Sequence, residues 1–205
     1  MRALILVDLQ YDFLPGGALA VARGDETIAV ANRVMPSFEL AIVTQDWHPA
    51  EHKSFAVNNP GTIPGEVVEV AGQPQVMWPA HCVQDSYGAE IHAGLDRARI
   101  TERFQKGTDV EIDSYSAFFD NGRKKSTGLG DFLRSRGVEQ VYVMGLATDY
   151  CVKYTALDAR QLGFDVFVIE DGCRAVELQP GDAERALDEM RQAGCTIVQS
   201  DAVLG

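Results

Sequence analysis

Residues 140–162 read QVYVMGLATDYCVKYTALDARQL, and this stretch decides the fold class. A short β-branched, apolar run at 140–144 predicts a buried strand, and the segment 149–162 has the periodicity of a helix. Gly145 follows the strand directly. A strand followed at once by a helix is the repeating unit of folds with a parallel sheet, so the same unit is expected elsewhere in the chain.

The alternation of strands and helices recurs along the whole chain. Most of the predicted strands are apolar throughout, which is typical of strands covered by helices on both faces. We therefore predict an α/β fold with three layers (α/β/α), a mostly parallel six-stranded sheet and Rossmann-like topology. A length of 205 residues with 46% apolar content fits a single domain, 1–205. The remaining strands are predicted at 3–7, 40–44, 97–104, 166–169 and 196–199, and the remaining helices at 25–35, 127–136 and 181–193.

Composition argues against a nucleic-acid partner and against a membrane protein. The net charge of -12 would repel a phosphate backbone, and the N-terminal apolar run stops at Asp8, too early for a membrane span. The four cysteines form no C-x-x-C pair and nothing marks secretion, so we expect reduced thiols and a cytoplasmic location. The sequence leaves open whether the chain forms a homo-oligomer.

One long segment, 46–91, breaks the alternation of strands and helices. It is rich in Pro, Gly and Asn and holds aromatic residues and three of the four histidines. Loops of this length in a compact domain are usually functional or disordered. Aromatic side chains are costly to leave solvated, so the segment is interpreted as a functional loop.

Chemically useful side chains stand where predicted strands end. Asp8 follows the first strand, Asp46 and His48 follow the second, Lys106 lies after the third, and Cys151 opens the helix after the fourth. Ligands of open α/β sheets bind beyond the carboxyl ends of the strands. These residues are therefore the candidates for a site that contains an acid, a metal half-site, a cation and a thiol.

Cys151 is the candidate nucleophile. It lies in the first turn of the predicted helix, where unpaired N–H groups and the helix dipole lower the pKa of a thiol and can bind an oxyanion. The alternative is a buried, inert cysteine packed as a small hydrophobe, which is the usual fate of a free cysteine. The other three cysteines are interpreted as buried, inert residues of this kind: Cys82, Cys173 and Cys195.

Asp8 and Lys106 each have a functional and an ordinary interpretation. Partial burial should raise the pKa of Asp8 and a nearby cation should oppose that rise, so its carboxylate can carry a proton. Its ordinary role would be to cap a turn. Lys106 would by default be a solvated surface residue, and only its position at a strand end favours a functional role.

The segment Asp46-Trp47-His48 presents two metal ligands on one face of an extended chain. His81 is the best third ligand, giving one carboxylate and two imidazoles with open positions for water or substrate. Pro49 makes a helical pair of His48 and His52 improbable, so His52 is a weaker candidate. The Asp-x-His pattern alone is a weak signal, because solvated or capping residues of these types are far commoner than ligands.

Taken together, these segments resemble the nicotinamidase/pyrazinamidase branch of the isochorismatase-like hydrolase superfamily. The resemblance runs over essentially the whole chain, and six pieces in the expected order make it specific. The pieces are Val7-Asp8-Leu9-Gln10 with Asp12-Phe13, Thr44-Gln45-Asp46-Trp47-His48-Pro49 with His52 and Ser54-Phe55-Ala56, Trp78-Pro79-Ala80-His81-Cys82-Val83-Gln84, Lys106-Gly107-Thr108-Asp109, Asp113-Ser114-Tyr115-Ser116-Ala117-Phe118, and Gly145-Leu146-Ala147-Thr148-Asp149-Tyr150-Cys151-Val152.

The resemblance implies a catalytic triad of Asp8, Lys106 and Cys151. It also implies a cis peptide between Leu146 and Ala147 that turns the Ala147 N–H toward the substrate. The backbone N–H groups of Ala147 and Cys151 would then form the oxyanion hole.

The resemblance further implies one divalent metal ion. Its ligands would be Asp46, His48 and His81, with His52 at a position whose coordination varies among relatives. Zinc is expected first, with iron or manganese as alternatives, because carboxylate and imidazole ligands accept all three. The resemblance also implies five substrate-binding residues: Phe13, Trp78, Tyr115, Leu146 and Ala147. For the three aromatic residues, the alternative interpretation is packing in the hydrophobic core.

The function implied is that of a metal-assisted cysteine amidohydrolase. It would convert nicotinamide to nicotinate and ammonia through a thioester, act on pyrazinamide as well, and serve pyridine nucleotide (NAD) salvage. Two alternatives stay open at this point. One is a related amidohydrolase that acts on a different small amide, and the other is a non-catalytic metal- or thiol-binding protein with the same fold.

Overall fold

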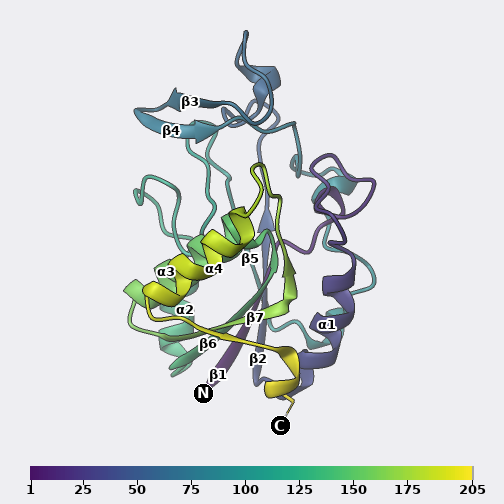
Figure 1. Ribbon diagram of the computed structural model, residues 1–205, viewed down its shortest axis with the longest axis vertical. Helices are drawn as coiled ribbons and strands as arrows, with labels where there is room; N and C mark the ends of the chain where they lie inside the picture. Colours follow the sequence, from purple (N-terminus) through teal and green to yellow (C-terminus); the bar gives the residue numbers. More distant parts are fainter. Residues whose placement is uncertain (205) are drawn as a thin grey trace.

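A six-stranded parallel sheet forms the centre of the molecule in the computed structural model, which describes residues 1–204 (Figure 1). The strand order is β5-β2-β1-β6-β7-β8, and every pairing in this sheet is parallel. The predicted parallel sheet is thus confirmed. Its strands are β1 (Arg2–Val7), β2 (Leu40–Asp46), β5 (Glu102–Lys106), β6 (Gln140–Leu146), β7 (Asp165–Arg174) and β8 (Thr196–Val198).

Helices cover both faces of the sheet, as predicted. Figure 1 shows α1 (Glu26–Val34) on one side and α2 (Leu129–Ser135), α3 (Lys153–Gln161) and α4 (Asp182–Gln192) on the other. Each of the longer helices buries one face against the sheet. No helix among residues 1–204 has the length and apolar character needed to cross a lipid bilayer. The short 3-10 helices are Tyr11–Phe13, Met35–Ser37, Ala56–Asn58, Tyr87–Ala89, Arg97–Arg99 and Ser200–Ala202.

The direction of winding reverses between β1 and β6. The chain moves from β1 outward to β2 and β5, then returns to the other side of β1 and continues through β6, β7 and β8. Such a reversal opens a crevice at the carboxyl ends of the two strands. Gly145 allows a close approach there: it pairs with Val7 at a φ of 127°, and an added Cβ would lie 2.2 Å from the Val7 carbonyl oxygen.

Three predicted elements differ from the structure. The strand predicted at 97–104 is wrong in its bounds, because Arg97–Arg99 is a 3-10 helix and β5 runs from Glu102 to Lys106. The segment predicted as a loop contains an antiparallel hairpin of β3 (Val67–Val70) and β4 (Gln73–Val76), which projects beyond the carboxyl end of the sheet (Figure 1). The helix predicted from 149 begins as a π-helix, Thr148–Val152, ahead of α3.

Candidate active site

Three side chains predicted to act together meet at the crevice. Asp8 follows β1, Lys106 ends β5, and Cys151 lies in the π-helical turn after β6. The Lys106 Nζ atom is 2.8 Å from Asp8 Oδ2 and 3.4 Å from Cys151 Sγ. All three side chains are buried. The structure therefore brings the acid, the cation and the thiol of the predicted triad into one cluster.

Lys106 is the cation that holds this cluster together. Its Nζ donates to Asp46 Oδ1 at 2.5 Å and to the Ser114 carbonyl oxygen at 2.9 Å, in addition to its contacts with Asp8 and Cys151. Burial by itself would lower the pKa of Lys106, but the charges of Asp46 and Asp8 outweigh it and raise the pKa well above its usual range. Lys106 is therefore an ammonium ion at neutral pH and does not act as the base.

Asp8 is placed to exchange a proton. Its Oδ1 accepts a hydrogen bond from Thr44 Oγ1 at 2.6 Å, and its backbone has a positive φ of 52°. Burial raises the pKa of Asp8, Lys106 lowers it and the charge of Asp46 raises it, which leaves the pKa at about 6. Such a carboxyl group is ionised at neutral pH and still basic enough to accept a proton.

Cys151 does not have the lowered thiol pKa that its place in the first turn of a helix predicts. Burial raises the pKa of its thiol well above the usual range, and the opposing effect of Lys106 is smaller. The sulfur lies within 4.8 Å of ligand atoms of Asp8 and Asp46, so a base is close to the thiol. The peptide bond between Leu146 and Ala147 is cis, as the resemblance implies.

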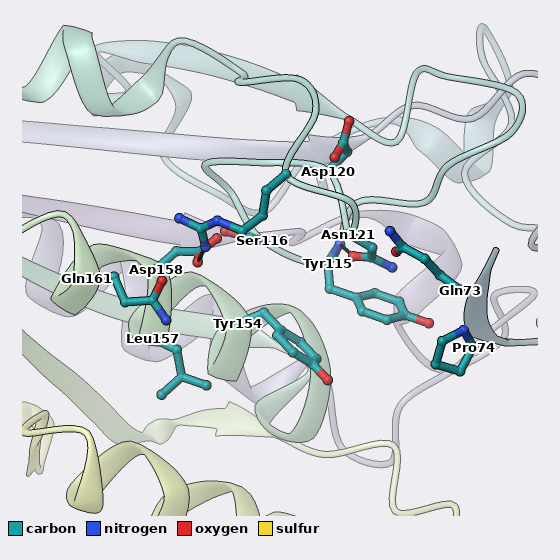
Figure 2. A pocket seen from close by; sticks show the side chains of 11 residues that line it. Gln73, Pro74, Tyr115, Ser116, Asp120, Asn121, Tyr154, Leu157, Asp158 and Gln161 are labelled. Atoms are coloured by element: carbon teal, nitrogen blue, oxygen red, sulfur yellow. Dashed lines mark hydrogen bonds and ion pairs between the residues drawn. The ribbon is translucent and has the colours of Figure 1, made fainter. Parts of the chain in front are cut away.

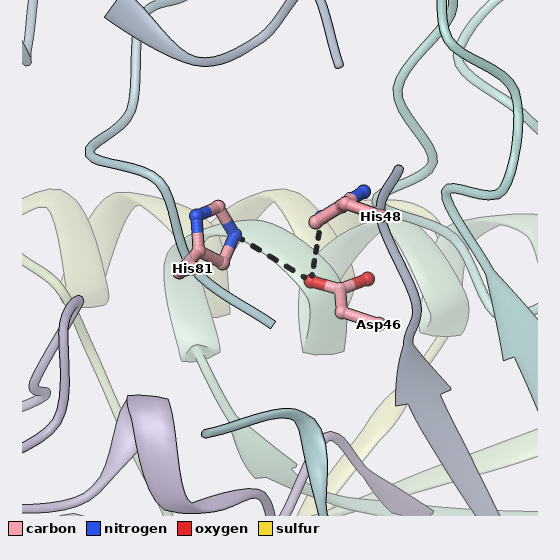
Figure 3. Close-up of side chains that lie close together, drawn as sticks. All are labelled: Asp46, His48 and His81. Carbon is pink, nitrogen blue, oxygen red and sulfur yellow. Dashed lines mark ion pairs between the residues drawn. The ribbon is translucent and has the colours of Figure 1, made fainter. Parts of the chain in front are cut away.

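Asp46, His48 and His81 form a second buried cluster beside the first (Figure 3). Asp46 Oδ2 lies 3.6 Å from His48 Nε2 and 3.9 Å from His81 Nε2, and Figure 3 shows both rings facing the carboxylate. These separations are longer than hydrogen bonds. They suit three ligand atoms arranged around a metal ion.

The chemistry of this cluster fits a divalent metal ion. His48 Nδ1 contacts the Gly107 carbonyl oxygen and His81 Nδ1 contacts the Pro79 carbonyl oxygen, each at 2.8 Å, which leaves both Nε2 atoms as donors to a metal. Within the described residues, the buried His48 Nε2 atom has no hydrogen-bond partner. Burial lowers the pKa of His81 to about 4, so its imidazole is neutral, as a metal ligand must be.

His52 belongs to a neighbouring group with His48 and Asp113 rather than to this cluster. Its ring centroid lies 4.4 Å from that of His48, and its Nδ1 contacts Ser54 Oγ at 2.7 Å. The His52 Nε2 atom is buried and unpartnered among the described residues. The structure thus leaves His52 close to the candidate metal site but in a different set of ligand atoms.

A narrow cavity connects the two clusters. Of the predicted substrate-binding residues, Phe13, Trp78, Tyr115 and Ala147 line it together with Cys151. Leu146 does not line the cavity; its side chain is buried in the hydrophobic core. Asp46 and His81 also form part of the wall, so a bound molecule would touch both the thiol and the metal ligands. Sequence reasoning did not single out the lining residues Leu19, Asp113, Tyr150 and Val176.

A larger cavity of about 450 Å³ lies outside this wall (Figure 2). Figure 2 shows the Tyr115 ring extending toward Gln73 and Pro74 of β4, with Tyr154 of α3 beside it. Tyr115 lines both cavities, whereas no member of the triad or of the metal cluster lines this one. Its size therefore does not make it the candidate active site.

Several residues that shape the site carried no separate signal in the sequence. Thr44 and Ser114 lie inside the motif pieces but contribute a hydroxyl and a backbone carbonyl, which no pattern singles out. Asp113 is a buried carboxylate that the motif contained without a role. Asp113 lies shortly after Lys106 in a stretch rich in Ser and Tyr, and this position could have identified it as a site residue.

Comparisons with known proteins identify the family of this chain. A family model of the isochorismatase domain matches residues 2–202. The nicotinamidase of Escherichia coli (strain K12) is 53% identical over 200 residues, which cover 96% of this chain and 93% of that protein. The solved Acinetobacter baumanii nicotinamidase/pyrazinamidase has a TM-score of 0.96 at 44% identity and covers 98% of this chain and 97% of its own. The pyrazinamidase of Pyrococcus horikoshii, solved in complex with zinc, has a TM-score of 0.79 at 38% identity and covers 97% and 98%.

Proposed function

This chain belongs to the isochorismatase domain family, and from that premise we propose that it is a nicotinamidase. It hydrolyses the carboxamide of nicotinamide to nicotinate and ammonia, in the salvage of NAD. The observation that supports this most strongly is the cavity that joins Cys151, Ala147, Asp46 and His81 between aromatic walls. That cavity presents a nucleophile and a ligand for a ring nitrogen to the same small molecule.

In the first half of the proposed reaction, Cys151 attacks the amide. Asp8 accepts the thiol proton, and the sulfur forms a bond to the carboxamide carbon while the C=O π electrons move to the oxygen. The backbone N–H groups of Ala147 and Cys151 stabilise this oxyanion, each by a few kcal/mol. Lys106 keeps Asp8 ionised before the attack, because its positive charge offsets the burial of the carboxylate.

In the second half, the C–N bond breaks and the thioester is hydrolysed. Asp8 returns its proton to the leaving nitrogen, so that ammonia departs and a nicotinoyl thioester of Cys151 remains. Water then attacks the thioester carbon while Asp8 accepts a proton from that water. Collapse of the second oxyanion expels the thiolate, which recovers its proton from Asp8, and the product leaves as nicotinic acid, which gives up its proton to water or to the released ammonia and becomes nicotinate.

We propose zinc as the resident metal ion, with Asp46, His48 and His81 as its ligands. A bound divalent ion would supply a Lewis acid for the pyridine nitrogen and so fix the orientation of the carboxamide over Cys151. The zinc in the Pyrococcus horikoshii pyrazinamidase supports this choice. We also assign the reaction to the cytoplasm, because all four cysteines are buried and free, as in a reducing compartment.

The test is an assay of ammonia release from nicotinamide. The zinc-loaded protein should release ammonia, and Cys151→Ala should abolish release while the circular dichroism spectrum stays unchanged. Cys195→Ala is the matched control, since that buried thiol lies outside the site and its loss should leave turnover intact. Full turnover by Cys151→Ala, or equal turnover of acetamide and nicotinamide, would contradict the proposal.

A further inference from the structure

We propose that Gln75, on the projecting hairpin, is a positioning residue that sets the wall of the substrate cavity. This inference rests on the proposed function. Among the eight residues of β3 and β4, Gln75 is the only buried one, with 6% of its surface exposed. Buried glutamine is uncommon and requires hydrogen-bond partners, so its contacts indicate what it does.

The side-chain amide of Gln75 holds two residues of the cavity wall. Its Nε2 atom has three acceptors within hydrogen-bond distance, which share its two N–H groups: Val76 O at 2.8 Å, and Asp113 Oδ2 and Tyr115 Oη at 3.1 Å each. The Trp78 Nε1 atom donates to the same Tyr115 hydroxyl at 3.2 Å. Gln75 itself does not line the cavity, whereas Asp113, Tyr115 and Trp78 all do.

The chemistry of these contacts requires a neutral donor at position 75. Asp113 is a buried carboxylate whose Oδ1 accepts from the Ser114 N–H, so Gln75 supplies the side-chain donor to its Oδ2. A hydrocarbon at position 75 would leave that oxygen without this donor, and a carboxylate would repel it. In either case Asp113 Oδ2 loses this side-chain donor, and the Tyr115 hydroxyl keeps only the hydrogen bond from Trp78.

This arrangement predicts an effect on substrate binding more than on bond cleavage. Gln75 makes no hydrogen bond to the triad. Lys106 binds the Ser114 carbonyl oxygen next to Asp113, but Asp8 and Asp46 also hold its ammonium group, so we expect the chemical groups to stay in position when Gln75 is changed. A looser Tyr115 and Asp113 would bind the ring less well. KM should therefore rise while kcat changes little, because the lost interaction is made in both the bound and the transition state.

The experiment compares Gln75→Leu with Gln73→Leu in the zinc-loaded enzyme. Gln73 lies on the same strand, is half-buried and makes no side-chain hydrogen bond among residues 1–204. Gln75→Leu should raise the KM for nicotinamide about tenfold with kcat within about twofold of wild type, and Gln73→Leu should match wild type. Gln75→Asn, a milder change whose shorter amide cannot reach both partners, should give the same pattern.

A double variant that exchanges the amide of Gln75 and the carboxylate of Asp113 distinguishes a positioning role from a purely structural one. Gln75→Glu should impair binding severely because two carboxylates then face each other. Adding Asp113→Asn restores one donor and one acceptor, so the double variant should bind better than the product of the single effects predicts. Normal KM in Gln75→Leu, a loss of kcat alone, or strictly additive effects in the double variant would overturn the inference.

Separate measurements test the role of Gln75 and the proposed function. Lack of nicotinamide turnover by the wild-type enzyme would refute the function but not the role of Gln75. The affinity of the zinc-loaded wild type and Gln75→Leu for nicotinate, measured by calorimetry, tests that role without turnover. We expect about tenfold weaker binding by the variant, and equal affinities would overturn the inference.

Discussion

Asp8 must be a carboxylate in the free enzyme to accept the Cys151 proton, so its ionisation should control activity on the acid side. Its pKa lies at about 6, raised by burial and by Asp46 against the opposing effect of Lys106. A protonated Asp8 cannot act as the base, so kcat/KM should fall about tenfold per pH unit below pH 6. A pH profile of kcat/KM checks this, with circular dichroism at each pH as the control for unfolding. A profile that stays flat to pH 4 would contradict the role of Asp8.

A substitution at Thr44 should shift that pH profile while all three triad residues are kept. Its hydroxyl donates to Asp8 Oδ1 at 2.6 Å, which stabilises the ionised form and lowers the pKa of Asp8. Thr44→Val keeps the shape but removes the donor, so the pKa should rise and the acid limb should move upward by about one pH unit. Thr44→Ser retains the hydroxyl and should keep the limb in place. An unmoved limb in Thr44→Val would show that the hydrogen bond does not tune Asp8.

The turn that carries Cys151 is tied to a distant loop through Asp149. This buried carboxylate accepts hydrogen bonds from the backbone N–H groups of Val176 at 3.0 Å and Glu177 at 2.8 Å, and Val176 lines the cavity. Asp149→Asn replaces one acceptor oxygen by a donor, so one N–H loses its partner. Stability should fall by about 1–3 kcal/mol in urea unfolding, and the KM for nicotinamide should rise.

Glu184→Gln is the control for that substitution. It also converts an acid to its amide, but on the exposed face of α4, and it should change stability by less than about 0.5 kcal/mol. An Asp149→Asn variant as stable as this control, with an unchanged KM, would show that the loop is held by other contacts.

The elements that the sequence predicted well are those buried on both faces. β1, β2 and β6 are apolar almost throughout, and their composition alone indicates a parallel sheet. β5 lies at the edge of the sheet and exposes charged residues, so its apolar signal is weak and its bounds were misjudged. The hairpin of β3 and β4 buries little besides Gln75, and its strands of four residues are too short to give a clear pattern in the sequence.

The candidate site was predictable to the extent that its residues follow strands. Asp8, Asp46 and Cys151 follow from the rule that parallel strands deliver ligand-binding groups at their carboxyl ends. Asp113 and Gln75 reach the site from a loop and from a hairpin, whose paths depend on tertiary contacts and not on local pattern. The pKa of Cys151 was misjudged for a similar reason, because burial is a property of the folded chain and not of the helix terminus.

Reversal of the winding between β1 and β6 determines the architecture of the whole site. It brings Asp8 and Cys151, 143 positions apart in the sequence, to neighbouring strand ends, and β2 and β5 add Asp46 and Lys106 on one side. Of the proposed metal ligands, Asp46 ends β2 and His48 follows it, whereas His81 lies 33 positions beyond His48 in the long segment before β5. An ion bound by them would connect parts of the fold that separate on unfolding.

Metal binding should consequently stabilise the whole molecule. A ligand that binds only the folded state at about 100 times its Kd adds about 2.7 kcal/mol of stability. For a chain of this length that corresponds to a rise of roughly 5–10 °C in Tm when zinc is added to the chelator-treated protein. His81→Ala removes one ligand and should reduce this rise strongly, as measured by differential scanning calorimetry. His92→Ala is the matched control, because His92 belongs to no metal cluster among the described residues, and it should keep the full rise. Equal zinc-dependent shifts in both variants would mean that the ion binds elsewhere.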